Sequence, residues 1–247
     1  MPAEVSPKMQ RGFWWRLMQR TWLVSLSMVV LLAAYPVNIR LTRVCLLVGI
    51  CGTWFCVGVR VWRVKLGRIL VLTIPIVVLM FWILPGRDVD PAGMRRDYVK
   101  ALRRYEGTRY IWGGENELGI DCSGLVRRAM ICADVGSGLR AFNPKLVREG
   151  LYIWWNRCNA RELGNGYRGR TRLVLSARSI NELDATQLLP GDLAVTSGGA
   201  HVLAYLGDAV WIEADPTVGR VITATSPSQN GWLTLPISIV RWRQLES

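Results

Sequence analysis

A cysteine stands at the expected start of a helix, where a thiol can act as a nucleophile. Asp121 is a good N-cap, which places Cys122 in the first helical turn. Apolar residues then recur at helical spacing, namely Leu125, Val126, Ala129, Met130 and Ala133. A helix N-terminus carries partial positive charge and unpaired N–H groups, so it lowers the pKa of a thiol and can receive an oxyanion. The pattern predicts a nucleophilic Cys122, with a buried structural cysteine as the alternative.

The single histidine of the chain, His201, lies far downstream of this cysteine. It opens an alternating strand directly after a glycine turn, which suits a side chain displayed at a strand end. A cysteine upstream and a histidine downstream are the candidate nucleophile and base of a thiol enzyme. A lone histidine is otherwise a surface residue or a satisfied core residue.

Four segments in this order resemble the NlpC-type cell-wall cysteine peptidases, which have papain-like topology: Tyr110–Gly114, Asp121–Val126, Pro190–Leu193 and His201–Gly207. The resemblance implies that Cys122 is the nucleophile and His201 its base. It also implies that Tyr110 lies near the thiolate, and that Asp121 and Ser123 bind a substrate amine. Without substrate, Asp121 and Ser123 would serve as helix caps.

A third polar group orients the imidazole in Cys–His hydrolases. The resemblance places it at Glu213, where the family more often has histidine, asparagine or glutamine. A three-residue loop, 206–208, would set His201 directly opposite Glu213 on one face of the sheet. A two-residue loop, 207–208, would turn Glu213 to the other face and leave Asp215 as a candidate. An exposed strand carboxylate is the alternative for Glu213.

The soluble part reads as helices followed by an antiparallel sheet, which is an α+β domain over residues 95–247 after a linker at 86–94. We expect helices over Met94–Tyr105, after Cys122, and over Lys145–Arg161. We expect strands over Thr171–Leu175, Asp192–Thr196, His201–Leu206, Val210–Asp215, Val218–Thr225 and within Trp232–Trp242. Cys122 and His201 are further apart than in a compact member of the family, so part of 133–187 is interpreted as an insertion, either packing or shaping the substrate site.

The first third of the chain carries three apolar runs, Trp22–Val37, Val44–Val59 and Ile69–Leu84. They predict three transmembrane helices over 22–85, after a basic cytoplasmic arm at 1–21. Basic residues concentrate in the arm and in the loop near residues 60–68, so the positive-inside rule puts both in the cytoplasm. The domain after Leu84 is then outside, in a multi-pass protein of the cytoplasmic membrane. If one run fails to span, the domain lies inside; buried core helices are the further alternative.

The net charge of +13 suits a polyanionic partner such as membrane phospholipid or cell-wall polymer. No nucleic-acid-binding motif accompanies the charge, so we expect no nucleic-acid partner. Six cysteines and one histidine show no zinc-ligand spacing, and we expect neither metal nor cofactor. Cys132 and Cys158 would be free to pair in an oxidising exterior. Oligomeric state stays open.

These features predict a membrane-anchored thiol hydrolase that cleaves amide bonds in peptidoglycan stem peptides through Cys122, His201 and Glu213. Two alternatives stay open at this point. One is a thiol acyltransferase or a lipid-directed hydrolase with the same fold. The other is a non-catalytic cell-wall binding module.

Overall fold

The computed structural model describes residues 7–246, and their side chains from residue 18 onward. The chain divides into two compact units between Trp82 and Ile83. Each unit is described by itself.

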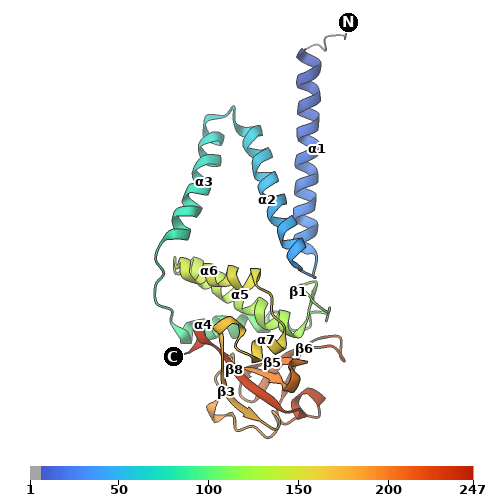
Figure 1. The fold of residues 1–247 in the computed structure, drawn as a ribbon, viewed down its shortest axis with the longest axis vertical. Coiled ribbons are helices and arrows are strands. Elements are labelled where there is room, and N and C mark those ends of the chain that lie inside the picture. Colours follow the sequence, from blue (N-terminus) through green and yellow to red (C-terminus); the bar gives the residue numbers. More distant parts are fainter. Residues whose placement is uncertain (1–6, 247) are drawn as a thin grey trace. The chain divides into compact units, whose positions relative to one another are not determined.

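The first unit contains three helices, α1 (Pro7–Ala34), α2 (Arg40–Val61) and α3 (Lys65–Ile83) (Figure 1). Small residues of α2 let α1 approach closely, as is common between helices in membranes. A Cβ atom at Gly49 would lie 2.9 Å from side-chain atoms of both Met28 and Val29. In α3 no residue is buried, and most of its apolar side chains are exposed.

Two of these helices, α2 and α3, are long and apolar enough to cross a membrane, judged by length and composition within the described residues. The apolar part of α1, Met18–Ala34, is shorter. Core helices of soluble proteins and signal sequences also meet this criterion. The length and composition of α2 and α3 indicate membrane association, and the three crossings stay a prediction.

The second unit begins with four helices: α4 (Pro91–Arg103), α5 (Cys122–Arg140), α6 (Pro144–Trp155) and α7 (Ala160–Gly164). Helix α4 starts earlier than expected because Asp90 caps it, accepting the N–H groups of Ala92 and Gly93, and because Pro91 suits the first helical position. Part of the expected linker is thus helical.

The single helix expected over Lys145–Arg161 is two helices. Helix α6 ends at Trp155, and Asn159 starts α7 with a capping box. In that box the Asn159 side chain accepts the Glu162 N–H, and the Glu162 carboxylate accepts the Asn159 N–H.

The rest of the unit is an antiparallel sheet of six strands in the order β3-β8-β4-β5-β6-β7. The strands are β3 (Thr171–Ala177), β4 (Leu193–Thr196), β5 (Val202–Gly207), β6 (Val210–Asp215), β7 (Arg220–Thr225) and β8 (Ile237–Trp242). A two-stranded ribbon, β1 (Glu115–Asn116) with β2 (Gly119–Ile120), precedes α5. The observed order of helices and then sheet confirms the predicted α+β class.

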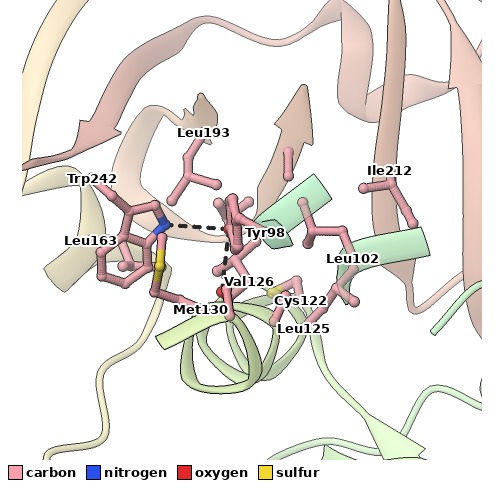
Figure 2. Packing of buried hydrophobic residues seen from close by; sticks show 14 of the residues in the cluster. Tyr98, Leu102, Cys122, Leu125, Val126, Met130, Leu163, Leu193, Ile212 and Trp242 are labelled. Atoms are coloured by element: carbon pink, nitrogen blue, oxygen red, sulfur yellow. Dashed lines mark hydrogen bonds between the residues drawn. The ribbon is translucent and has the colours of Figure 1, made fainter. Parts of the chain in front are cut away.

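The main core lies between the helices and one face of this sheet (Figure 1). Tyr98 of α4 is buried at its centre, where its hydroxyl donates to the Val126 carbonyl and accepts from the Trp242 indole N–H (Figure 2). Cys122 borders the same cluster (Figure 2). A second core, with Leu203, Tyr205 and Trp211, covers the opposite face. The nucleophile helix is therefore fixed against the sheet that carries the histidine.

Candidate active site

Cys122 is the first residue of α5, and Asp121 caps the helix as expected. One Asp121 oxygen accepts the Gly124 N–H at 2.5 Å and the Ser123 hydroxyl at 3.0 Å. The other oxygen accepts the Gly113 N–H at 2.8 Å. Asp121 thereby ties the glycine turn to the helix that presents the thiol.

Three glycines, two in the turn before Cys122 and one just after it, allow the turn and helix α5 to approach closely. Gly113 has φ +75°, a left-handed conformation that favours glycine. A Cβ atom at Gly124 would lie 2.1 Å from the Gly114 carbonyl oxygen, and one at Gly114 would lie 2.4 Å from the Gly119 carbonyl oxygen. The backbone of the turn therefore packs directly against the first turn of α5.

His201 is buried beside Glu213, and its Nε2 lies 2.5 Å from the Glu213 Oε2. The other carboxylate oxygen accepts the Asn230 side-chain amide at 2.6 Å. The Trp232 ring stacks on the imidazole, with centroids 4.2 Å apart and planes 20° from parallel. Because Glu213 occupies Nε2, Nδ1 is the ring nitrogen that remains for proton transfer.

The register that brings His201 and Glu213 together differs from both expected loops. The β5–β6 turn is Asp208-Ala209, with φ +51° and +59°, and Gly207 pairs with Val210. A regular hairpin with this turn would put Glu213 on the face opposite to His201. The register instead shifts between Tyr205 and Gly207, so that Ala204 pairs with Ile212. This bulge returns Glu213 to the face of His201, diagonally rather than directly opposite.

The Cys122 sulfur lies near the histidine strand, since the backbone N–H of Val202, the residue after His201, hydrogen-bonds to it. Burial raises the pKa of the Cys122 thiol to about 12, and the Asp121 charge adds to this. The N–H groups of Val202, Ser123 and Cys122 oppose the rise. The expected lowering by the helix N-terminus is therefore outweighed, and the resting site holds a neutral thiol.

Tyr110 lies close enough to the thiol for their charges to interact, as the resemblance implies. Burial raises the pKa of Tyr110 to about 12, with further contributions from Cys122 and Asp121. Its hydroxyl is therefore a neutral hydrogen-bond donor over the physiological range. Asp121 and Ser123 are buried and bonded to each other, which fits their capping role. Their binding of a substrate amine stays a prediction.

A cleft of about 510 Å³ opens at Cys122. Tyr110, Trp112 and Ser123 line it on the side of the glycine turn. The cleft is also lined by Arg157–Glu162, and by Gly199 and Ala200 just before His201. The thiol, its tyrosine neighbour and the turn that carries the histidine thus meet at one cavity.

Sequence reasoning missed Asn230 and Trp232, which hold the carboxylate and the imidazole. Both belong to the segment around the short helix η4 (Gly231–Thr234), which lies at the start of the range 232–242 where one or two strands were expected. The spacing of these residues from Glu213 in the sequence carries no signal of contact.

Cys132 and Cys158 are both free thiols. The Cys132 sulfur lies 3.8 Å from the Tyr105 hydroxyl, whereas Cys158 lines the same cleft as Cys122. Among the described residues, no three His, Cys, Asp or Glu side chains cluster as metal ligands.

Fold and site together define a papain-like Cys–His arrangement, with a cysteine at a helix start and a histidine on an antiparallel sheet. The sequence profile of the NlpC/P60 family matches residues 107–241, more than half of the chain. The chain belongs to the NlpC/P60 family.

One curated relative is dipeptidyl-peptidase 6 of Lysinibacillus sphaericus, 28% identical over 120 residues. The match covers 49% of this chain and 32% of that protein, so the chain spans about a third of its relative's length.

Similar solved structures include the peptidoglycan hydrolase RipB of Mycobacterium tuberculosis and NlpC2 of Trichomonas vaginalis. RipB is 23% identical with TM-score 0.38, over 64% of this chain and 67% of RipB. NlpC2 is 20% identical with TM-score 0.41, over 62% of this chain and 48% of NlpC2.

Proposed function

We propose that this chain is a membrane-anchored thiol hydrolase that cleaves amide bonds in peptidoglycan stem peptides. The proposal rests on two contacts, which connect Glu213 to His201 and the strand of His201 to Cys122. Glu213 binds His201 Nε2, and the backbone just after His201 contacts the Cys122 sulfur. Membership of the NlpC/P60 family supports a cell-wall substrate, and the relative RipB is itself described as a peptidoglycan hydrolase.

The reaction begins with transfer of the Cys122 proton to His201 Nδ1. Because burial holds the thiol pKa at about 12, we propose that this transfer accompanies attack on the amide carbonyl. Glu213 then stabilises the imidazolium that forms, as the carboxylate of a triad does. The nearby N–H groups of α5 receive the oxyanion.

Collapse of the tetrahedral intermediate expels the amine, which takes its proton from His201 and leaves an acyl-enzyme on Cys122. Water, activated by the same histidine, hydrolyses the thioester. The neutral Tyr110 hydroxyl is proposed to donate to the substrate, since Tyr110 lines this cleft. Asp121 and Ser123 are proposed to bind a substrate amine from the same side.

The membrane anchor is proposed to cross the bilayer three times. Helix α1 has 28 residues, more than the roughly 20 that a crossing needs, although its apolar part is shorter. Its more polar N-terminal turns would then lie at the cytoplasmic interface, where basic residues are favoured. Three crossings would put the catalytic unit on the side where peptidoglycan lies.

Replacing the nucleophile tests the chemistry. The variant Cys122→Ser should lose hydrolysis of labelled muropeptides by at least about a hundredfold, because serine is a far weaker nucleophile without its own activating geometry. The matched control is Cys132→Ser, which removes a thiol that lies outside the cleft and should keep activity. Circular dichroism checks that both variants fold.

The same assay decides between substrates. Wild-type activity on labelled phospholipids and none on muropeptides would favour the lipid-directed alternative. Full activity of Cys122→Ser on muropeptides would overturn the proposed mechanism.

A further inference from the structure

Helices α2 and α3 of the first unit meet at the turn 62–64 and border a groove between them. Close to the turn the two helices touch, since a Cβ atom at Gly58 would lie 3.2 Å from the Val71 Cγ1. Beyond this contact the helices separate (Figure 1). The groove has a volume of about 830 Å³, within the range of about 300–1,000 Å³ that is common for ligand pockets.

The lining of this groove is apolar except at one end. Apart from Arg63, every lining residue is apolar, including Trp54 and Phe55 of α2 and Ile74 and Val78 of α3. All four of these side chains are exposed in the structure. Because exposed apolar surface of this extent is unfavourable in water, the groove is suited to an apolar occupant.

The length of the groove indicates which apolar occupant fits. Its lining on α2 runs from Ile50 to Trp62, which is about 18 Å at the rise of an α-helix. One leaflet contributes about 15 Å of a hydrocarbon core that is about 30 Å thick. A partner helix that crossed the membrane would need a surface about twice as long. The groove therefore matches an acyl chain of one leaflet better than a second transmembrane helix.

Arg63 places a positive charge at the end of the groove beside the turn. Its side chain is exposed, and among the side chains that the structure describes no carboxylate lies at ion-pair distance from it. The sequence explains this, because it has no acidic residue between Glu4 and Asp88. Three further cations lie near the turn in the sequence, namely Arg60, Lys65 and Arg68. A phosphate group would supply the missing counter-charge, and a guanidinium binds phosphate well.

We propose that this groove binds one anionic phospholipid, with its phosphate at Arg63 and one acyl chain between α2 and α3. The site goes beyond the proposed hydrolysis and rests only on the proposed membrane anchor. In the proposed topology the turn lies at the cytoplasmic leaflet, which is rich in anionic lipids. Basic pockets between transmembrane helices on that side bind phospholipid headgroups in other membrane proteins. The bound chain would fill the space in which α2 and α3 do not pack against each other.

The charge of the site is tested by native mass spectrometry of the full-length protein in detergent micelles. The protein is titrated with dioleoyl phosphatidylglycerol and with dioleoyl phosphatidylcholine, which have the same acyl chains. The anionic lipid should bind about fivefold more tightly, which is the typical contribution of one basic residue at a lipid surface. Arg63→Gln should reduce the ratio of the two dissociation constants to about one. The matched control Arg40→Gln, an exposed residue at the other end of α2, should keep the ratio.

The apolar part of the site is tested by filling the groove. Val78→Trp should weaken the binding of both lipids severalfold, because the larger ring takes the space of the acyl chain. The matched control is Val77→Trp, since Val77 is the adjacent residue, is similarly exposed and does not line the groove. This variant should bind both lipids as the unmodified protein does.

Equal affinity for the two lipids would overturn the inference. So would a preference that survives Arg63→Gln in protein whose circular dichroism is unchanged. A lipid-free dimer that Val78→Trp dissociates would also overturn it, because a second copy would then occupy the groove. If the full chain did not float with phosphatidylglycerol vesicles, the anchor and the lipid site would fail together. Muropeptide hydrolysis should be the same in all four variants, since none of the changed residues lines the cleft at Cys122.

Discussion

At the scale of single residues, the site is defined by the partners that already hold the His201 ring and the Glu213 carboxylate. Glu213 and Trp232 hold the imidazole from its Nε2 and from one face, and Asn230 holds the carboxylate. On the other side, burial keeps the Cys122 thiol neutral. A raised thiol pKa favours the proposed general-base mechanism over a preformed thiolate–imidazolium pair.

This distinction predicts how the reactivity of Cys122 depends on pH. The thiol pKa is raised to about 12, so the reactive thiolate is scarce below that value and increases as pH rises toward it. Alkylation of Cys122 by iodoacetamide should accelerate about tenfold per pH unit between roughly pH 6 and 10. An ordinary thiol, with a pKa near 8.5, would level off within this range.

The measurement is site-specific mass spectrometry of alkylated peptides, with Cys122→Ser protein giving the background from the other cysteines. A plateau of the alkylation rate between pH 6 and 8 would show a preformed thiolate and contradict the general-base mechanism.

At the scale of elements, the start of α5 depends on backbone contacts that leave no room for side chains. The Gly124 position faces the Gly114 carbonyl oxygen at the glycine turn. The same helix contains Gly136, where a Cβ atom would meet at nearest the flexible end of Arg140 at 3.4 Å. One helix thus offers a tight and a loose glycine for comparison.

The variant Gly124→Ala should lower the free energy of unfolding by about 1–3 kcal/mol, because the new methyl group displaces the turn from the helix. Activity should fall with it, since Cys122 lies in the same turn. The control Gly136→Ala should be neutral or stabilising by up to about 1 kcal/mol, as expected for alanine in a helix. Denaturant unfolding of both variants measures the difference; equal effects would mean that the turn does not pack as described.

Many of the helix and strand boundaries near the site were predictable from local sequence patterns. The N-cap at Asp121, the start of the nucleophile helix and the bounds of β6 follow from capping residues and alternation. The bulge between Tyr205 and Gly207 did not, because an alternating pattern does not reveal an extra residue in a strand. The shift of the Cys122 pKa was missed for a related reason, since it depends on burial by distant segments.

At the scale of the whole molecule, function depends on the side of the membrane that the catalytic unit occupies. The proposed three crossings, with the positive-inside rule, would place the α2–α3 loop in the cytoplasm and the catalytic unit outside. If only α2 and α3 crossed, the catalytic unit would share the side of the N-terminus.

Paired cysteine variants test this topology in intact cells. Arg178→Cys, in the catalytic unit, should react with a membrane-impermeant maleimide, whereas Arg63→Cys, in the α2–α3 loop, should react only after lysis. Both positions are exposed in the structure, so accessibility within each unit does not limit labelling. The unmodified chain sets the background. Labelling of Arg63→Cys alone in intact cells would reverse the topology and remove access to peptidoglycan.

Gly199, which lines the cleft, lies close to Arg161 of α7, and this contact also bears on how such proteins diverge. Gly199 has φ +71°, and any side chain there would overlap the backbone of α7. Asparagine tolerates this conformation, but it has no space while α7 is present. Lineages that have lost α7 should therefore admit asparagine before the histidine, whereas those that keep it should retain glycine. An alignment of homologues would show whether the residue at position 199 changes together with the presence of α7.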